Sequence, residues 1–206
     1  MTLKLLICMI VGYMFGCIST AYIIGKINHI DIRSYGSGNA GTTNAMRTLG
    51  KKAGVITYIG DAFKTIIPIL LMAFIFSSEI KFHLACLVTG LGVVLGHNYP
   101  FWLKFKGGKG IAVTSMVILM YNPFWALLYI AIFVGILKTL KYVSVGSLAI
   151  VTVFFLQVAI FSSNEPYYMV QFFLALVFCI LAYYSHRTNI VRLMNGTENK
   201  VGQKKE

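Results

Sequence analysis

Long apolar runs alternate with short polar segments along the whole chain. The apolar runs cover residues 3–24, 53–76, 82–96, 111–137, 143–161 and 167–184. An α-helix needs about 20 apolar residues to cross the roughly 30 Å hydrocarbon core of a bilayer. The pattern therefore predicts an all-α integral membrane protein. No repeat or linker divides the chain, so we expect a single domain over residues 1–206.

The fourth apolar run is too long for one crossing, since a straight helix over 111–137 would measure about 40 Å. Tyr121-Asn122-Pro123 interrupts this run, and Asn followed by Pro is typical of a turn. We therefore split it into two short helices, which gives about seven crossings. The first run exceeds the roughly 7–15 residues of a signal-peptide core, so we expect it to be a retained transmembrane helix.

Charge separates the polar segments into two groups. Of the 18 Lys and Arg residues, all except Lys4, Lys64 and Lys81 lie in segments 26–52, 97–110, 138–142 and 185–206. Cytoplasmic loops carry such a basic excess, so we expect these segments and the C-terminus in the cytoplasm and the N-terminus outside. With 58% hydrophobic and 12% charged residues, the chain is too apolar for a soluble protein. The net charge of +12 accompanies no nucleic-acid-binding motif.

The segment 26–52 contains a glycine-rich stretch, Gly36-Ser37-Gly38-Asn39-Ala40-Gly41-Thr42-Thr43-Asn44-Ala45-Met46-Arg47. Small residues allow several backbone N–H groups to converge on an anion, and Ser and Thr add hydroxyl donors. Arg47 adds a planar fork that suits phosphate. The stretch matches Gly-x-Gly-x-x-Gly only weakly as a dinucleotide motif, because no strand-helix-strand unit surrounds it. We expect a phosphate site here rather than a plain flexible loop.

The segment 97–110 ends in Gly107-Gly108-Lys109-Gly110, which leads directly into an apolar run. A helix that begins there presents its N–H groups and the positive end of its dipole to an anion, with Lys109 beside it. The stretch is not a Walker motif, because Leu103 occupies the first glycine position. The aromatic residues of this segment suit either interfacial anchors or the wall of an acyl-chain groove.

Two further features are open to more than one interpretation. The tail 185–206 contains His186, Asn189 and Arg192, and is either a solvated basic tail or part of a site. Asp61 lies three residues before Lys64 within an apolar run, so the two suit either a structural ion pair or a function. Metal and disulfide roles are not expected, because the cysteines are scattered through apolar runs at Cys8, Cys17, Cys86 and Cys179.

Taken together, these motifs resemble those of the bacterial PlsY-type acyl-phosphate:glycerol-3-phosphate acyltransferases. The resemblance spans nearly the whole chain. It rests on Gly36-Ser37-Gly38-Asn39 with Asn44 and Arg47, Gly96-His97 with Gly107-Gly108-Lys109-Gly110, Asn189-Ile190-x-Arg192-Leu193 with Gly196-Thr197-Glu198, and also Ser19-x-Ala21-Tyr22 and Gly60-Asp61-x-x-Lys64. The chain departs from the family pattern at Thr65, where glycine is common, and at Val113, where threonine is frequent.

The resemblance implies a seven-helix protein of the bacterial plasma membrane with its active site facing the cytoplasm. It implies transfer of a fatty acyl group from acyl phosphate to the sn-1 hydroxyl of glycerol 3-phosphate. The products are 1-acylglycerol 3-phosphate (lysophosphatidic acid), which enters phospholipid synthesis, and inorganic phosphate. The expected partners are glycerol 3-phosphate, long-chain acyl phosphate and membrane lipid, with no metal or other cofactor. The sequence identifies no protein partner.

On this basis the candidate residues divide into two groups. Around glycerol 3-phosphate we place Ser37, Arg47, Lys109, His186 and Asn189. Around the acyl phosphate we place the backbone of Gly107, Gly108 and Gly110, with Asn39, Gly41 and Thr42. Asn44, His97, Arg192 and Glu198 complete the expected site, although Glu198 is better suited to orienting the basic tail than to reacting. The proton acceptor is left open between His186, His97 and a phosphate oxygen of the substrate.

Two other classes of protein remain as alternatives. A small carrier or binding protein for an organic phosphate would use the same loops, but carriers usually bind near mid-membrane between repeated halves, and no halves match here. An acyl-CoA-dependent acyltransferase would need a His-x-x-x-x-Asp motif. Neither histidine completes one, because Trp102 follows His97 and Val191 follows His186 at that spacing.

Overall fold

The computed structural model describes residues 1–201, which form helices joined by turns and loops, with no strand among them. Contacts within the chain divide it into two compact units, Met1–Tyr121 (unit 1) and Asn122–Glu206 (unit 2). The last five residues of the predicted tail 185–206 lie outside the described part. The all-α prediction is confirmed for the described residues, and the single domain expected over 1–206 stays a prediction.

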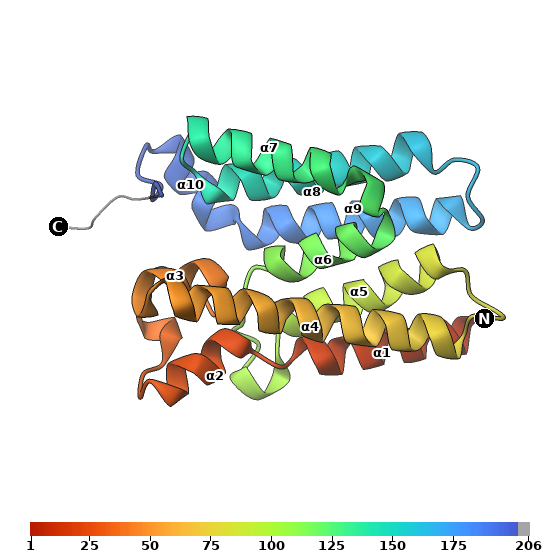
Figure 1. Ribbon diagram of the computed structural model, residues 1–206, viewed down its shortest axis with the longest axis horizontal. Helices are drawn as coiled ribbons and strands as arrows, with labels where there is room; N and C mark the ends of the chain where they lie inside the picture. Colours follow the sequence, from red (N-terminus) through yellow and green to blue (C-terminus); the bar gives the residue numbers. More distant parts are fainter. Residues whose placement is uncertain (202–206) are drawn as a thin grey trace. The chain divides into compact units, whose positions relative to one another are not determined.

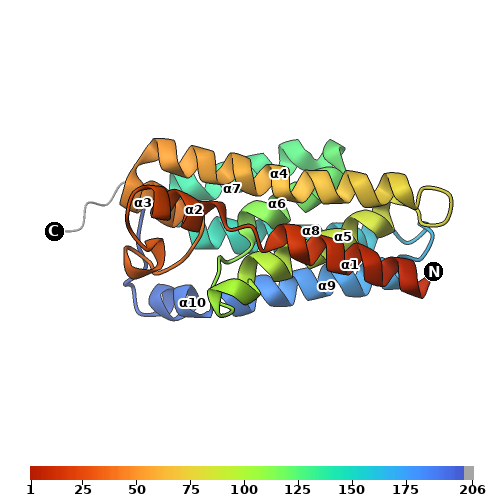
Figure 2. The same cartoon turned by 90° about the horizontal axis from the view of Figure 1, so that it is seen from below.

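Unit 1 is built from long apolar helices and short polar ones. Its elements are α1 (Thr2–Gly16), α2 (Thr20–Ile27), the 3-10 turn η1 (Ile32–Ser34), α3 (Thr42–Leu49), α4 (Lys51–Ile75), α5 (Phe82–Asn98), the 3-10 turn η2 (Phe101–Leu103) and α6 (Ile111–Tyr121). The short helices α2 and α3 lie at the end of the unit that is away from the N-terminus (Figure 1, Figure 2). The polar segment 26–52 is thus gathered at one end of the long helices.

The core of unit 1 is α5, which is buried along most of its length and packs directly against α1. Glycines on both helices allow this close approach, as in small-residue packing motifs of membrane helices. A Cβ on Gly16 would lie 2.2 Å from the carbonyl oxygen of Val93, and one on Gly96 would lie 2.2 Å from that of Tyr13. Larger residues at these two positions would push the helices apart.

The first apolar run differs from the single helix expected over 3–24. Helix α1 ends at Gly16 and α2 begins at Thr20, so the run is broken at residues 17–19. The backbone carbonyls of Cys17 and Ile18 at this break accept hydrogen bonds from the side chains of Trp102 and Lys64. The two pieces together still form a candidate span, Thr2–Ile27.

Unit 2 begins with the 3-10 turn η3 (Pro123–Trp125) and continues through α7 (Ala126–Thr139), α8 (Val143–Phe161), α9 (Tyr168–Ser185) and α10 (Arg187–Met194). Its core contains Phe154 and Phe178, whose rings meet edge to face with centroids 6.3 Å apart. Tyr129 on α7 donates a hydrogen bond to Gln157 on α8. Helix α10 lies at the end of unit 2 where α7 turns into α8 (Figure 1).

Five helical segments among residues 1–201 are long and apolar enough to cross a membrane, or six if the pair interrupted at residue 122 is counted as one span. The predicted interruption at Tyr121-Asn122-Pro123 is confirmed. Helix α6 ends at Tyr121, and the Asn122 side chain accepts a hydrogen bond from the Phe124 backbone N–H. The count of seven crossings and the outside position of the N-terminus stay predictions.

Candidate functional site

The stretch 36–41, which we call the first glycine loop, is folded around the buried side chain of Asn44. Asn44 Oδ1 accepts a hydrogen bond of 2.8 Å from the Ser37 N–H, and Nδ2 donates bonds of 3.0 Å to the carbonyls of Ile32 and Tyr35. Gly36 has φ +61°, and a Cβ there would lie 2.2 Å from Asn44 Oδ1. Asn44 therefore shapes the loop from inside, while Ser37 is exposed.

Helix α3 follows the first glycine loop and begins without a side-chain cap. Gly41 is its N-cap residue and Thr42 its first residue. The first N–H groups of any α-helix have no acceptor within the helix, so this end suits an anion. Thr42 Oγ1 is buried and has no hydrogen-bond partner among the described residues. Arg47 lies exposed in the last turn of the same short helix.

The stretch 107–110, which we call the second glycine loop, folds back onto the end of α5. The Gly107 N–H donates to the Asn98 carbonyl (3.0 Å), and the Gly108 N–H donates to the His97 carbonyl (2.9 Å). A Cβ on Gly108 would lie 1.9 Å from His97 Nε2, so no side chain fits there. Gly110 has φ +83° and its carbonyl accepts from the Thr114 N–H, which opens α6.

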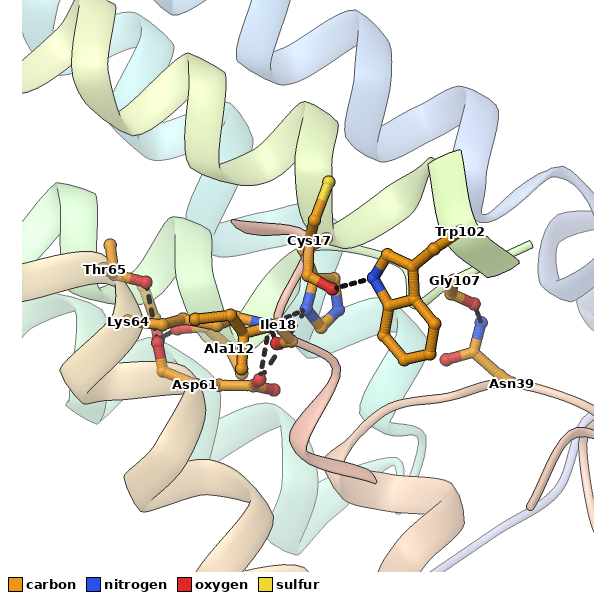
Figure 3. A network of polar contacts seen from close by, with 11 residues as sticks. Cys17, Ile18, Asn39, Asp61, Lys64, Thr65, Trp102, Gly107 and Ala112 are labelled. Atoms are coloured by element: carbon orange, nitrogen blue, oxygen red, sulfur yellow. Dashed lines mark hydrogen bonds and ion pairs between the residues drawn. The ribbon is translucent and has the colours of Figure 1, made fainter. Parts of the chain in front are cut away.

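The two glycine loops touch each other within unit 1. The Gly107 carbonyl oxygen accepts a hydrogen bond of 3.4 Å from Asn39 Nδ2 (Figure 3). It accepts a second bond of 3.4 Å from the Ala40 N–H. A second link runs from Arg33 Nη1 to the Leu103 carbonyl oxygen at 3.2 Å. The structure thus brings together the two stretches that the sequence marked separately as anion sites.

Arg33 is held in place by a neighbouring carboxylate. Arg33 Nη2 lies 2.7 Å from Asp31 Oδ2, and the guanidinium stacks over the Tyr22 ring with its carbon 5.0 Å from the ring centroid. The hydrogen bonds from Arg33 lower the pKa of Asp31 to about 2. The Asp31 carboxylate therefore stays ionised at any physiological pH. It holds the Arg33 side chain where it can bond to Leu103 in the segment 97–110.

A buried ionic cluster lies beside these loops. Lys64 Nζ lies 2.8 Å from Asp61 Oδ1, and the two side chains are 3% and 1% exposed (Figure 3). The same ammonium donates a 2.8 Å hydrogen bond to the carbonyl of Ile18 and lies 2.9 Å from His97 Nδ1. The ion pair foreseen as one interpretation of Asp61 and Lys64 is present, and His97, expected near substrate, is 5% exposed and contacts this pair.

In unit 2, the carboxylate of Glu198 collects the polar side chains of the tail. It accepts hydrogen bonds from Asn189 Nδ2 (2.6 Å), Arg192 Nε (2.8 Å) and Ser144 Oγ (3.0 Å). Burial raises the pKa of Glu198, but the hydrogen bonds from Arg192, Asn189 and Ser144 outweigh this and hold the pKa below its usual value. Glu198 is therefore ionised, and it fixes the first turns of α10.

His186 precedes α10 and is 4% exposed. Its Nδ1 lies 2.8 Å from the Ala182 carbonyl oxygen, and since a carbonyl can only accept, Nδ1 carries the hydrogen. His186 and Asn189 stand three residues apart, on the same side of the first turn. Ser144 on α8 was missed in the sequence, because a lone hydroxyl in an apolar run gives no signal of its role.

The candidate residues are therefore found in two clusters, each within its own unit. Unit 1 holds Ser37, Asn39, Gly41, Thr42, Asn44, Arg47, His97, Gly107, Gly108, Lys109 and Gly110, and unit 2 holds His186, Asn189, Arg192 and Glu198. Within residues 1–201, no group of three His, Cys, Asp or Glu side chains is arranged to hold a metal ion.

Comparison with known proteins places these motifs in a family. The family model described as glycerol-3-phosphate acyltransferase matches residues 6–196. The chain is 43% identical over 200 residues to the glycerol-3-phosphate acyltransferase of Alkaliphilus metalliredigens, covering 97% of each chain. It is 41% identical over 198 residues to that of Thermoanaerobacter pseudethanolicus, covering 96% of each.

Two solved structures resemble this one. Both are crystal structures of PlsY, described as an integral membrane glycerol 3-phosphate acyltransferase. The glycerol 3-phosphate form has 37% sequence identity and a TM-score of 0.84, with 96% of each chain covered. The lysophosphatidic acid form has 36% identity and a TM-score of 0.81, covering 96% of this chain and 95% of that one. With its apolar helices, this chain is a multi-pass membrane protein, and it belongs to the glycerol-3-phosphate acyltransferase family.

Proposed function

We propose that this protein transfers a fatty acyl group from acyl phosphate to the sn-1 hydroxyl of glycerol 3-phosphate. The bond between the acyl carbon and the phosphate oxygen breaks, and an ester bond to the sn-1 oxygen forms. Inorganic phosphate leaves, the hydroxyl proton passes to a base, and 1-acylglycerol 3-phosphate enters phospholipid synthesis. Family membership supports acyl transfer to glycerol 3-phosphate. The observation that carries the rest is the contact of the two glycine loops at the Gly107 carbonyl.

The contact of the loops suits a reaction between two anions. It places the start of α3 and the start of α6 close to the same backbone, so that two sets of helix N–H groups are available for phosphate oxygens. Arg47 and Lys109 add positive charge that offsets the repulsion between the two reactants. Orientation of reactants alone supplies effective molarities of about 10⁵ M or more, which suits an already activated acyl donor.

We assign the two phosphates to different groups of residues. Ser37, Arg47, Lys109, His186 and Asn189 bind glycerol 3-phosphate. The backbone of 107–110, with Asn39, Gly41 and Thr42, binds the acyl phosphate. The unpartnered Thr42 hydroxyl at the start of α3 supports this second assignment. Asn44 and Glu198 act by holding the first glycine loop and the tail in shape.

The surroundings of His97 and His186 bear on which group accepts the proton, a phosphate oxygen of the substrate being the third candidate. His97 Nδ1 is occupied by Lys64, and its Nε2 edge faces the backbone of Gly108. This favours His186 or a phosphate oxygen of the substrate as the base, for a gain of about 10²–10⁴ in rate. No carboxylic acid lies in either glycine loop to assist a poorer leaving group. Phosphate needs less such assistance, which supports acyl phosphate as the donor.

The site is proposed to face the cytoplasm of a bacterium. The four basic segments meet in pairs, 26–52 with 97–110 in unit 1, and 138–142 with the tail in unit 2 through the hydrogen bond from the Val201 N–H to the Lys141 carbonyl. Single cysteines at Ser37, Lys106 and Thr197, in a variant without the native cysteines, should all react from the cytoplasmic side. Opposite sidedness of any one of them would contradict the proposed topology.

The decisive assay uses purified protein in detergent with labelled glycerol 3-phosphate. Acyl phosphate, acyl-CoA and acyl carrier protein are supplied as donors at equal concentrations. Product should form only from acyl phosphate, with one inorganic phosphate released for each ester formed. Comparable turnover with acyl-CoA would show that the donor is assigned wrongly. Binding of glycerol 3-phosphate without ester formation from any donor would indicate a carrier instead.

A further inference from the structure

The break at residues 17–19 exposes backbone carbonyls inside unit 1. The last carbonyls of a helix have no partner within it, and in a membrane protein such groups need partners from elsewhere. The Cys17 carbonyl accepts a 2.8 Å hydrogen bond from the Trp102 indole, and the Ile18 carbonyl accepts one of 2.8 Å from Lys64 (Figure 3). The break is therefore built into the fold, with one donor from η2 and one from α4.

Lys64 connects this break to two long helices. Within 2.9 Å of its ammonium lie the Ile18 carbonyl oxygen, Asp61 Oδ1 on its own helix α4, and His97 Nδ1 at the end of α5. An ammonium has three hydrogens and accepts none, so three acceptors match its capacity. His97 Nδ1 must then be the acceptor, and the neutral ring carries its hydrogen on Nε2. This arrangement fixes the orientation of the His97 ring.

The His97 ring in turn limits where the second glycine loop can lie. A Cβ on Gly108 would be 1.9 Å from Nε2 and 2.7 Å from Cδ2, so the Gly108 backbone lies directly against the ring. The His97 carbonyl also accepts the hydrogen bond from the Gly108 N–H. A rotation of the ring would displace the loop whose Gly107 carbonyl meets the first glycine loop.

We infer that Asp61 and Lys64 are positioning residues, which act through His97 to hold the second glycine loop where it binds the phosphate of the acyl donor. Neither side chain touches substrate, since both are almost completely buried. Asp61 neutralises Lys64, Lys64 orients the ring, and the ring supports the Gly108 backbone. The inference rests on the proposed function for the identity of the anion, but not for the placement of the loop.

The test replaces both charges together, because a single replacement would leave one buried charge without its partner. The variant Asp61→Asn/Lys64→Met removes the ammonium at nearly constant volume. A second variant, His97→Gln, leaves the ion pair intact and removes the ring. The matched control is Thr57→Val on the same helix α4, because the buried Thr57 hydroxyl donates to the Ala53 carbonyl of its own helix.

Two measurements separate positioning from simple stability. The first is the KM for each substrate, measured on protein that elutes as folded in gel filtration. The second is the mobility of a nitroxide on Lys106→Cys, next to the second glycine loop, with a nitroxide on Thr197→Cys in unit 2 as reference. Both labels are placed in a background without native cysteines that retains wild-type turnover.

We expect the double variant and His97→Gln to raise the KM for acyl phosphate about 10-fold or more, because small displacements of a binding group are costly. The KM for glycerol 3-phosphate should rise clearly less than the KM for acyl phosphate, because Lys109 is the one proposed glycerol 3-phosphate residue that lies in the second glycine loop. The Lys106 label should become more mobile, and the Thr197 label and the Thr57→Val control should not change. Equal rises in the KM for acyl phosphate and in the KM for glycerol 3-phosphate would overturn the inference. Unchanged mobility of the Lys106 label in both the double variant and His97→Gln would also overturn it. Absence of turnover in the wild type would refute the proposed function instead, while the label would still test the loop.

Discussion

The two candidate clusters present polar groups in opposite ways. In unit 1, the glycine loops offer backbone N–H groups, and the side chains that matter most there, Asn44 and His97, are buried beneath the loops. In unit 2, the groups on offer are side chains, and a single carboxylate, Glu198, fixes Asn189 and Arg192 together. The first arrangement depends on Gly36 and Gly108, where any side chain would collide with Asn44 or His97, and the second depends on one charged side chain.

This difference determines which kind of substitution should damage each cluster. A backbone site has no side chain to delete, so it is damaged by adding atoms that displace the loop. A site held by one buried carboxylate is damaged by removing charge, because several donors lose their acceptor at once. Substitutions that add a methyl group and substitutions that remove a charge should therefore separate the two clusters.

The largest loss of turnover is expected from removing the basic side chains of Arg47 and Lys109. Arg47→Ala and Lys109→Ala should lower kcat/KM by about 10²–10³, because each removes a fixed positive group beside a phosphate. Arg47→Lys should recover little, since an ammonium cannot reproduce the planar fork. Turnover of purified, folded protein is the measurement.

Lys138→Ala is the control for that series, because Lys138 is an exposed basic residue in a predicted cytoplasmic segment of unit 2. It should leave turnover within about twofold. Equal losses from all of these substitutions would mean that the basic residues act through general attraction to anionic lipid rather than through a site.

The next largest effect is expected from displacing the backbone of the second glycine loop in unit 1. Gly108→Ala should lower turnover about 10²-fold, because its Cβ would collide with the His97 ring at 1.9 Å and move the loop. Gly135→Ala on α7 is the matched control, since nothing lies within 4 Å of its Cβ position. The control should keep full turnover and gain up to about 1 kcal/mol of helix stability. An active Gly108→Ala enzyme would show that the loop does not need its backbone position.

The sequence predicted the features of these clusters that local chemistry determines. Asn122 and Pro123 interrupt a helix by their own covalent structure, and an acid three residues before a base on a helix can pair with it. The structure has the interruption and also the ion pair, which was one of the two interpretations of Asp61 and Lys64. The glycine-rich stretches could be recognised in the sequence because polar loops between apolar helices rarely contain so many small residues.

What could not be predicted depends on partners that are distant in the sequence. The break at residues 17–19 carries no proline, and its carbonyls find Trp102 and Lys64 only in the folded chain. The hydroxyl of Ser144 is joined to Glu198 across 54 positions. The structure also places the amide of Asn44 beneath the first glycine loop, which no spacing rule reveals.

A moderate effect is expected from the carboxylate that fixes unit 2. Glu198→Gln keeps the size of the side chain but turns an amide N–H toward Arg192 or Asn189, so stability should fall by about 1–3 kcal/mol. Turnover should fall about 10-fold if the tail positions His186 and Asn189. Glu79→Gln is the control, since Glu79 is an exposed carboxylate whose ion pair with Lys4 lies at the surface. It should change neither quantity, and identical effects from both would remove the special role of Glu198.

The ionisation of Glu198 also predicts how the stability of the protein depends on pH. The pKa of Glu198 in the folded protein lies below its usual value, so the unfolded state takes up protons first as the pH falls. The stabilisation is therefore complete above the usual glutamate pKa of about 4.3 and is lost as the pH drops below it. Thermal unfolding in detergent should show a decline below that pH in the wild type and a smaller decline in Glu198→Gln. Identical curves would contradict the proposed network.

The smallest effect is expected from the partly exposed ion pair that links the polar segments of unit 1. Asp31→Asn removes the negative charge beside Arg33 but keeps an oxygen that can accept from the Arg33 N–H. Arg33 can still reach the Leu103 carbonyl, so turnover should fall by no more than about threefold, in line with the small worth of exposed pairs. Arg33→Gln loses both the pair and that link, and should cost more than Asp31→Asn. Because the pKa of Asp31 is about 2, lowering the pH from 7 to 5 should leave this difference unchanged. If Asp31→Asn were as damaging as Gly108→Ala, a surface charge and not the backbone would hold the two glycine loops together, and the contrast between the two units would fail.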